Sequence, residues 1–136
     1  MFDTPGNIQP RAQGRAVLSS KERGGKSAID TLHQSGCLRV LFPRGGPALD
    51  AVLINTSGGI TGGDHIAVSA QVGAKSALTI TTQAAERAYR AQPYLTGEIT
   101  TEIGVGDNAM LRWLPQELIL FEGSRMSRRL DINLAA

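Results

Sequence analysis

A glycine-rich segment organises this chain, and it reads Leu53-Ile54-Asn55-Thr56-Ser57-Gly58-Gly59-Ile60-Thr61-Gly62-Gly63-Asp64. An apolar run precedes it and an alternating run follows it, which predicts a tight turn between two strands. Paired glycines suit such a turn, because they adopt positive φ angles and let other backbone approach closely. We therefore expect four structural turn residues, Gly58, Gly59, Gly62 and Gly63. The turn either only connects strands, which is the commoner case, or has a functional role in which it positions polar groups or lets another backbone come near.

On both sides of this turn, the sequence predicts a mainly β fold of stacked sheets. Alternating polarity and β-branched residues between turn signals indicate roughly ten short strands. They cover residues 14–23, 26–34, 37–42, 51–54, 65–72, 78–82, 98–105, 109–114, 117–121 and 128–134. Residues 83–90 form the best helical candidate, so at most one or two short helices are expected. No fixed-period repeat is visible, so both a sandwich-like and a β-helix-like stack remain open.

The length of the chain predicts one domain, because 136 residues suffice for a single hydrophobic core. Residues 1–13 hold two prolines and few apolar side chains, and we expect them to be a flexible leader. The chain ends directly after a good strand pattern, without a charged tail. Because an open strand edge is a liability in a complete protein, we expect residues 14–136 to be a truncated domain.

Composition and charge exclude several functional classes. The formal net charge of +2 at pH 7 is too small to indicate a nucleic-acid-binding protein. Cys37 is the only cysteine, so an intrachain disulfide is excluded and a reducing, cytoplasmic location is expected. No apolar run is long enough to span a membrane. The low charged fraction of 19% suggests a surface that is covered by a partner.

Two phosphate-binding patterns are incomplete. Gly25-Lys26-Ser27 matches the end of a Walker A loop, but Ser20 stands where that motif requires its first glycine. Residues 58–63 resemble a dinucleotide loop, but Ser57 replaces the first glycine and a strand follows instead of a helix.

Sites for metal binding and nucleophilic catalysis are not visible either. His33, Cys37 and His65 are too few and too scattered for a tight metal site, which needs three or four convergent ligands. The Gly-x-Ser-x-Gly pattern of a nucleophile elbow is missing from the sequence. From these residues alone, the sequence shows no recognisable catalytic site.

Four stretches, taken in order, resemble the urease accessory protein UreD (UreH) family. They are residues 38–43 (LRVLFP), 54–64 (INTSGGITGGD), 78–90 (LTITTQAAERAYR) and 113–121 (WLPQELILF). Each is short, but their order and spacing are specific, and the resemblance covers nearly the whole chain after the leader. It implies that residues 14–136 are the N-terminal portion of a single mainly β UreD-like domain, about half of a usual family member.

This resemblance implies a maturation scaffold without catalytic activity. Proteins of the family bind apo-urease and the accessory protein UreF, which recruits the GTPase UreG. Nickel carried by the GTPase then passes through the scaffold to the urease active site. The implied partners are therefore apo-urease, UreF and UreG, with no nucleic acid and no membrane. We expect no tightly bound cofactor, and nickel only in transit.

A transient nickel path needs weak oxygen ligands, because a tight cage of cysteine and histidine would retain the ion. Asp64 and Glu86, together with Thr82 and Gln83, carry such oxygens and lie in the two most family-like stretches. We expect these four residues to line the path, the alternative for each being turn capping or surface solvation. Asp64 follows the glycine turn and is expected to point outward, so that its loss costs little stability.

The aromatic residues Trp113 and Phe121 are expected in the core rather than at a partner contact.

Two other functions remain open at this point. One is a small all-β binding module for an acidic ligand, without a role in metal delivery. The residues that would meet this ligand are Arg11, Arg15, Lys21, Arg23 and Lys26. The other is a nucleotide-using enzyme built on the loop at residues 25–27.

Overall fold

The computed structural model describes residues 11–135, which form eleven strands and no helix. The strands are β1 (Gln13–Arg23), β2 (Lys26–Gly36), β3 (Leu38–Leu41), β4 (Leu49–Asn55), β5 (His65–Val72), β6 (Ala77–Thr82), β7 (Glu86–Ala88), β8 (Gly97–Val105), β9 (Met110–Leu114), β10 (Leu118–Leu120) and β11 (Met126–Leu134). No helix long and apolar enough to cross a membrane therefore occurs in the described part. The prediction of a mainly β fold of stacked sheets is confirmed.

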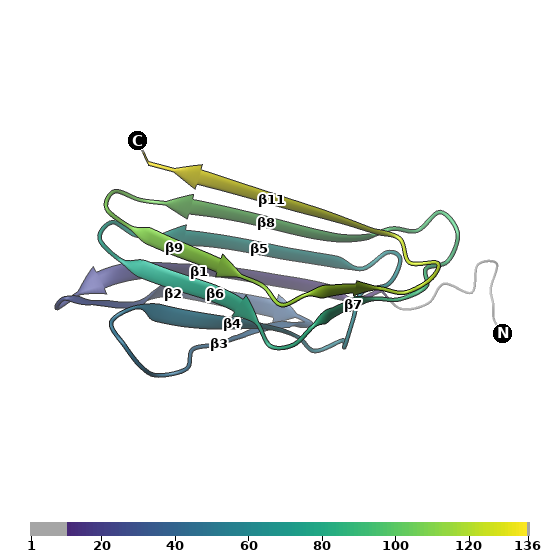
Figure 1. The fold of residues 1–136 in the computed structure, drawn as a ribbon, viewed down its shortest axis with the longest axis horizontal. Coiled ribbons are helices and arrows are strands. Elements are labelled where there is room, and N and C mark those ends of the chain that lie inside the picture. Colours follow the sequence, from purple (N-terminus) through teal and green to yellow (C-terminus); the bar gives the residue numbers. More distant parts are fainter. Residues whose placement is uncertain (1–10, 136) are drawn as a thin grey trace.

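Three sheets run along the molecule, and the chain visits them in turn. A five-stranded sheet has the order β11-β8-β5-β1-β2, a four-stranded sheet has the order β3-β4-β6-β9, and β10 pairs with β7. Figure 1 shows β11, β8, β5 and β1 stacked above one another, with β9, β6 and β4 in a second layer. Each strand from β4 to β8 pairs in parallel with the strand one coil later, as in a β-helix.

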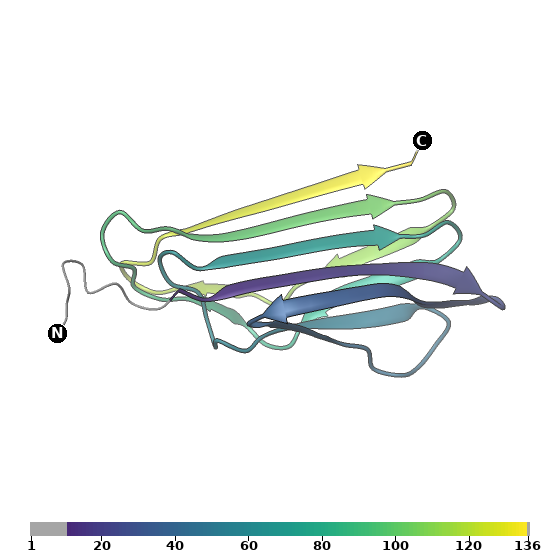
Figure 2. The same ribbon diagram turned by 180° about the vertical axis from the view of Figure 1, so that it is seen from behind.

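Two antiparallel pairs lie at the start of this stack. β1 and β2 form a hairpin, and β3 pairs with β4 in the same antiparallel way. The view from behind shows β2 at one edge of the five-stranded sheet and β11 at the other (Figure 2). The hairpin turn at Gly24 and Gly25 has positive φ at both residues, which is the arrangement that a two-residue hairpin prefers. The Walker-like residues 25–27 are therefore part of a hairpin and not of a phosphate loop.

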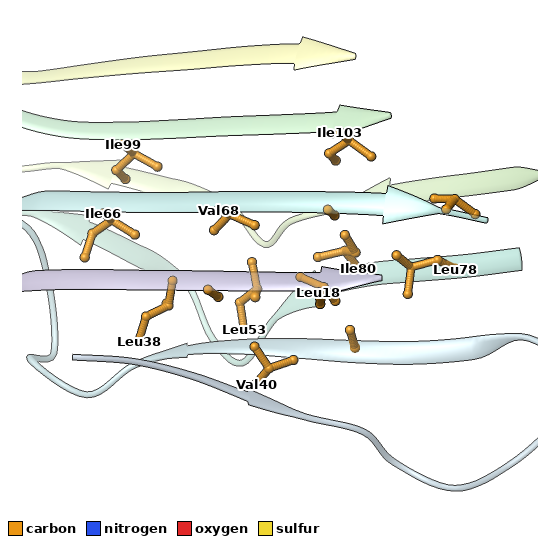
Figure 3. Close-up of a cluster of buried hydrophobic side chains, with 14 of the residues drawn as sticks. Leu18, Leu38, Val40, Leu53, Ile66, Val68, Leu78, Ile80, Ile99 and Ile103 are labelled. Atoms are coloured by element: carbon orange, nitrogen blue, oxygen red, sulfur yellow. The ribbon is translucent and has the colours of Figure 1, made fainter. Parts of the chain in front are cut away.

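The core lies between the two large sheets and consists of aliphatic side chains that point inward on every second strand position. Figure 3 shows Leu18, Ile66 and Ile103 of the five-stranded sheet near Leu53 and Ile80 of the other sheet. Ile80 is completely buried, and Leu18 and Ile103 are 1% exposed. This alternation arises because successive residues of a strand face opposite sides of a sheet.

The predicted helix at residues 83–90 is wrong. The segment instead contains β7, which pairs in parallel with β10, and Ala88 forms a bridge to Ile60 of the preceding coil. The backbone N–H of Glu86 donates to the carbonyl oxygen of Glu117 at 2.8 Å. A helix of two turns is marginal in isolation, whereas the neighbouring coils offer a partner to each backbone group of this segment.

The predicted leader, residues 1–13, lies largely outside the described residues, which start at Arg11. Of its last three residues, Gln13 already belongs to β1 and pairs in register with His65.

The last described strand exposes apolar side chains at inward positions, and this leads to a first testable prediction. Leu130, Ile132 and Leu134 of β11 follow the inward rows of β8 but are 42%, 40% and 72% exposed. We expect the 136-residue chain to self-associate through this edge, since exposed strand edges with apolar side chains recruit further strands. Size-exclusion chromatography with light scattering measures this association. Ile132→Lys should reduce it more than Asn133→Lys, and a wild-type monomer at high concentration would contradict the prediction.

Candidate functional site

The central turn uses its four glycines in two different ways. Gly58 and Gly63 have positive φ angles of 84° and 87°, which residues with a Cβ rarely adopt. Gly59 and Gly62 do not have positive φ, so our expectation of such angles throughout the turn is wrong for these two. They are needed instead because other backbone approaches them closely.

The crowding around these two glycines comes from the following coil. A Cβ on Gly62 would lie 2.8 Å from the carbonyl oxygen of Leu95 and 2.9 Å from the Cβ of Ala91. A Cβ on Gly59 would lie 2.9 Å from the carbonyl oxygen of Arg87, against the ring of Tyr89. The turn thus does bring other backbone near, as the second of the two interpretations requires.

This crowding predicts that Gly62→Ala already destabilises the protein. We expect a loss of about 1 kcal/mol in the free energy of unfolding for alanine and about 2 kcal/mol for Gly62→Val, because an inserted Cβ overpacks the site. Urea unfolding of both variants, followed by circular dichroism, measures the effect. An alanine variant as stable as the wild type would mean that the approach of Leu95 does not limit this position.

Asp64 ends the turn as a buried group and does not point outward, which corrects our expectation. Asp64 is only 3% exposed. One carboxyl oxygen, Oδ1, accepts the backbone N–H of Ala12 at 2.9 Å, and the other, Oδ2, accepts that of Thr61 at 2.9 Å. Asp64 therefore ties the entry of β1 to the central turn.

A cavity of about 390 Å³ lies beside the turn, between the sheets. Its apolar lining includes Leu38, Leu53, Ile66, Val68, Ile99 and Trp113. Its polar lining includes Asn55, Thr82, Gln83, Glu86, Thr101 and Arg128. Three of the four residues predicted for a nickel path, Thr82, Gln83 and Glu86, thus border one space, while Asp64 is not among its lining residues.

Two threonines face this cavity from opposite sheets. Thr82 of β6 is 9% exposed, and its hydroxyl accepts the backbone N–H of Gln116 at 2.9 Å. Thr101 of β8 is 4% exposed, and its hydroxyl has no hydrogen-bond partner among residues 11–135. A buried polar atom without a protein partner is costly unless water or another small polar species satisfies it. The cavity therefore offers an oxygen lining to a polar occupant.

Glu86 and Arg128 form an ion pair at the border of the cavity. The Arg128 Nη2 donates to Glu86 Oε1 at 3.0 Å, and the two side chains are 32% and 27% exposed. Arg128 pairs in register with Ile99, whose side chain points into the core. A cation therefore occupies an inward position on β11, while its carboxylate partner comes from β7 of another sheet.

The charge around the cavity is unbalanced. Glu86 is the one carboxylate among the described lining residues, whereas Arg87, Arg128 and Arg129 also border the space. The Nε–H of Arg129 donates to Oδ2 of Asp131 at 2.8 Å. Nowhere between residues 11 and 135 do three histidine, cysteine, aspartate or glutamate side chains converge. The site can thus offer a divalent cation weak oxygen contacts, with Glu86 as its one anionic ligand.

The remaining sequence candidates lie apart from this site or at its rim. Trp113 is partly buried, packs against the core and lines the cavity. Phe121 is 44% exposed, and its ring centroid lies 5.1 Å from that of Tyr89. The expectation of a core position is therefore wrong for Phe121. Burial raises the pKa of the Cys37 thiol, which opposes reactivity because less thiolate is present at neutral pH.

Thr101 and Arg128 are the two site residues that the sequence did not single out. Arg128 stands in the same alternating phase as Leu130, Ile132 and Leu134, so it is a charge at a position where the pattern calls for an apolar residue. That mismatch is a signal which could have identified it. Thr101 gives no comparable signal, because threonine is common on both faces of strands.

Comparison with known proteins gives a consistent result. The model of the family described as UreD urease accessory protein matches residues 12–136. A protein of Ruegeria sp. (strain TM1040) named urease accessory protein UreD is 60% identical over 127 residues, which are 93% of this chain and 43% of that protein. Proteins of the same name from Ruegeria pomeroyi and Agrobacterium fabrum are 52% and 43% identical, over 86% and 93% of this chain. The chain covers 46% and 44% of those two proteins, so it spans less than half the length of these relatives.

Proposed function

Because this chain belongs to the UreD family of urease accessory proteins, we propose that it forms the N-terminal part of a scaffold that assists nickel insertion into urease. The observation that carries the proposal is the family match over residues 12–136. In this proposal the complete protein binds apo-urease and UreF, and UreF brings the GTPase UreG. No reaction is assigned to the chain, and nickel is its cargo.

The cavity supports a role as a nickel path. Thr82, Gln83 and Glu86 supply oxygens to one space, and the Thr101 hydroxyl, which has no partner in the described part of the chain, favours a polar occupant of the interior. Oxygen ligands hold Ni²⁺ more loosely than thiolate or imidazole, so an ion can enter and leave. In this reading Asp64 acts indirectly, by holding the turn that borders the cavity, and not as a ligand.

The binding module for an acidic ligand has less support. Lys21 is paired with Asp30 at 3.7 Å. Arg15 and Arg23 stand eight residues apart on the extended strand β1, which corresponds to about 26 Å. Arg15 and Arg23 are therefore too far apart to meet one small ligand.

A gene replacement tests the proposed function. A urease-producing strain that lacks the full-length gene should contain apo-urease with little nickel, and the wild-type gene should restore it. Affinity purification of the full-length protein should also retain apo-urease and the two accessory proteins. Fully nickel-loaded urease in the deletion strain, grown at limiting nickel, would refute the role.

A further inference from the structure

We propose that the ion pair of Glu86 with Arg128 is a gate that masks the Glu86 carboxylate from divalent cations. The proposal rests on the proposed function, in which nickel passes this cavity. It adds a residue outside the four predicted for the path, because Arg128 now controls when Glu86 can act as a ligand.

Arg128 occupies an inward-facing position on β11. Its register partner Ile99 is 7% exposed, and Leu130 follows at the next inward position of β11. The Arg128 side chain is 32% exposed, so it keeps part of its hydration, and a nearby carboxylate supplies a further partner for its charge. Glu86 is that partner, at 3.0 Å, and the pair spans from the five-stranded sheet to β7 across the border of the cavity.

The positive charge of Arg128 opposes the binding of a cation at Glu86. A guanidinium is a permanent cation, so Arg128 presents a full positive charge to Glu86 whenever the pair is formed. While Arg128 stays in place, a divalent cation that approaches Glu86 meets a fixed positive charge a few ångströms away, and like charges repel strongly at this distance. The carboxylate becomes available only when the arginine side chain swings away.

The ion pair is accessible enough for the Arg128 side chain to move. Both side chains are about one-third exposed or less but not sealed, so the arginine can rotate without unfolding of β11. Partly exposed ion pairs contribute little to stability, which means that opening requires little free energy. A pair that were essential to the fold would not serve as a gate.

Neighbouring Arg129 provides a matched control. It also borders the cavity, but its guanidinium pairs with Asp131 on the same strand, and its side chain is 74% exposed. Arg129→Gln removes the same charge from the same strand without freeing Glu86. A difference between Arg128→Gln and Arg129→Gln therefore reports on the pair and not on net charge.

The experiment measures Ni²⁺ binding to the purified full-length protein by isothermal titration calorimetry. Arg128→Gln should bind Ni²⁺ about tenfold more tightly than wild type, since removal of a cation next to a carboxylate favours a second cation there. Arg129→Gln should bind as wild type does, and the double variant Arg128→Gln with Glu86→Gln should lose the gain. Arg128→Lys keeps the charge and should keep weak binding. If the Arg128→Gln protein does not fold, Arg128→Met, which retains the apolar stem of the side chain, takes its place.

The outcomes separate the gate from the function. Equal Ni²⁺ affinity for the Arg128→Gln and Arg129→Gln proteins would overturn the gate, even if nickel delivery to urease still depends on Glu86. Tighter binding by Arg128→Gln, combined with nickel delivery that does not depend on Glu86, would instead establish the masking and refute the path.

Discussion

Asp64→Ala is expected to lower the free energy of unfolding by about 3 kcal/mol, because two partly buried backbone N–H groups lose a charged acceptor. The donors are Ala12 at the entry of β1 and Thr61 in the central turn, each at 2.9 Å from a carboxyl oxygen. Loss of both bonds frees the first strand of the parallel stack from the turn. Urea unfolding of the full-length protein, followed by circular dichroism, measures the change.

A matched surface variant controls this experiment. Asp131 is paired only with Arg129 among the described residues, and its side chain is 40% exposed, so Asp131→Ala should change stability by less than about 0.5 kcal/mol. If Asp64→Ala costs as little as Asp131→Ala, Asp64 is not the structural tie that its two hydrogen bonds indicate.

The strands could be predicted from the sequence because burial of one sheet face leaves a period of two. Ile66, Val68, Ala70 and Val72 are such a run, and all four are buried in β5. The coil repeat could not be predicted in the same way. Ile66 pairs with Ile99, 33 residues later, and Ile99 pairs with Arg128, 29 residues later, so turns of unequal length and unlike residues hide the period.

The strand conformation within residues 83–90 depends on partners that lie far away in the sequence. Ala88 pairs with Ile60 and with Leu120, and neither partner can be inferred from the local pattern. Local preference therefore favoured a helix, while tertiary pairing imposed a strand.

The candidate site was predicted in part for a related reason. Thr82 ends β6, Glu86 begins β7 and Gln83 lies in the short link between them, so this link places all three beside the cavity. Arg128 reaches Glu86 across 42 residues, and only the parallel pairing of β8 with β11 brings it there. Asp64 was misplaced because an acidic residue after a glycine turn caps buried N–H groups as readily as it faces solvent.

Glu86→Gln is expected to lower the nickel content of urease matured with the full-length protein by about tenfold, because loss of a ligand costs at least as much metal affinity as the roughly tenfold lost with a residue that only supports one. Among the described lining residues the variant removes the one carboxylate and with it the negative charge that faces Arg128, so the remaining lining charge is positive. Glu102→Gln is the matched control, because Glu102 neighbours Thr101 on β8 but is exposed on the outer face.

Nickel per urease active site, determined by mass spectrometry at equal amounts of assembled accessory complex, tests the proposed nickel path most directly. The path through the cavity predicts that urease matured with the Glu86→Gln protein contains about one-tenth of the nickel found with the wild-type and Glu102→Gln proteins. Equal nickel in all three preparations would contradict it and would leave Glu86 as a structural partner of Arg128.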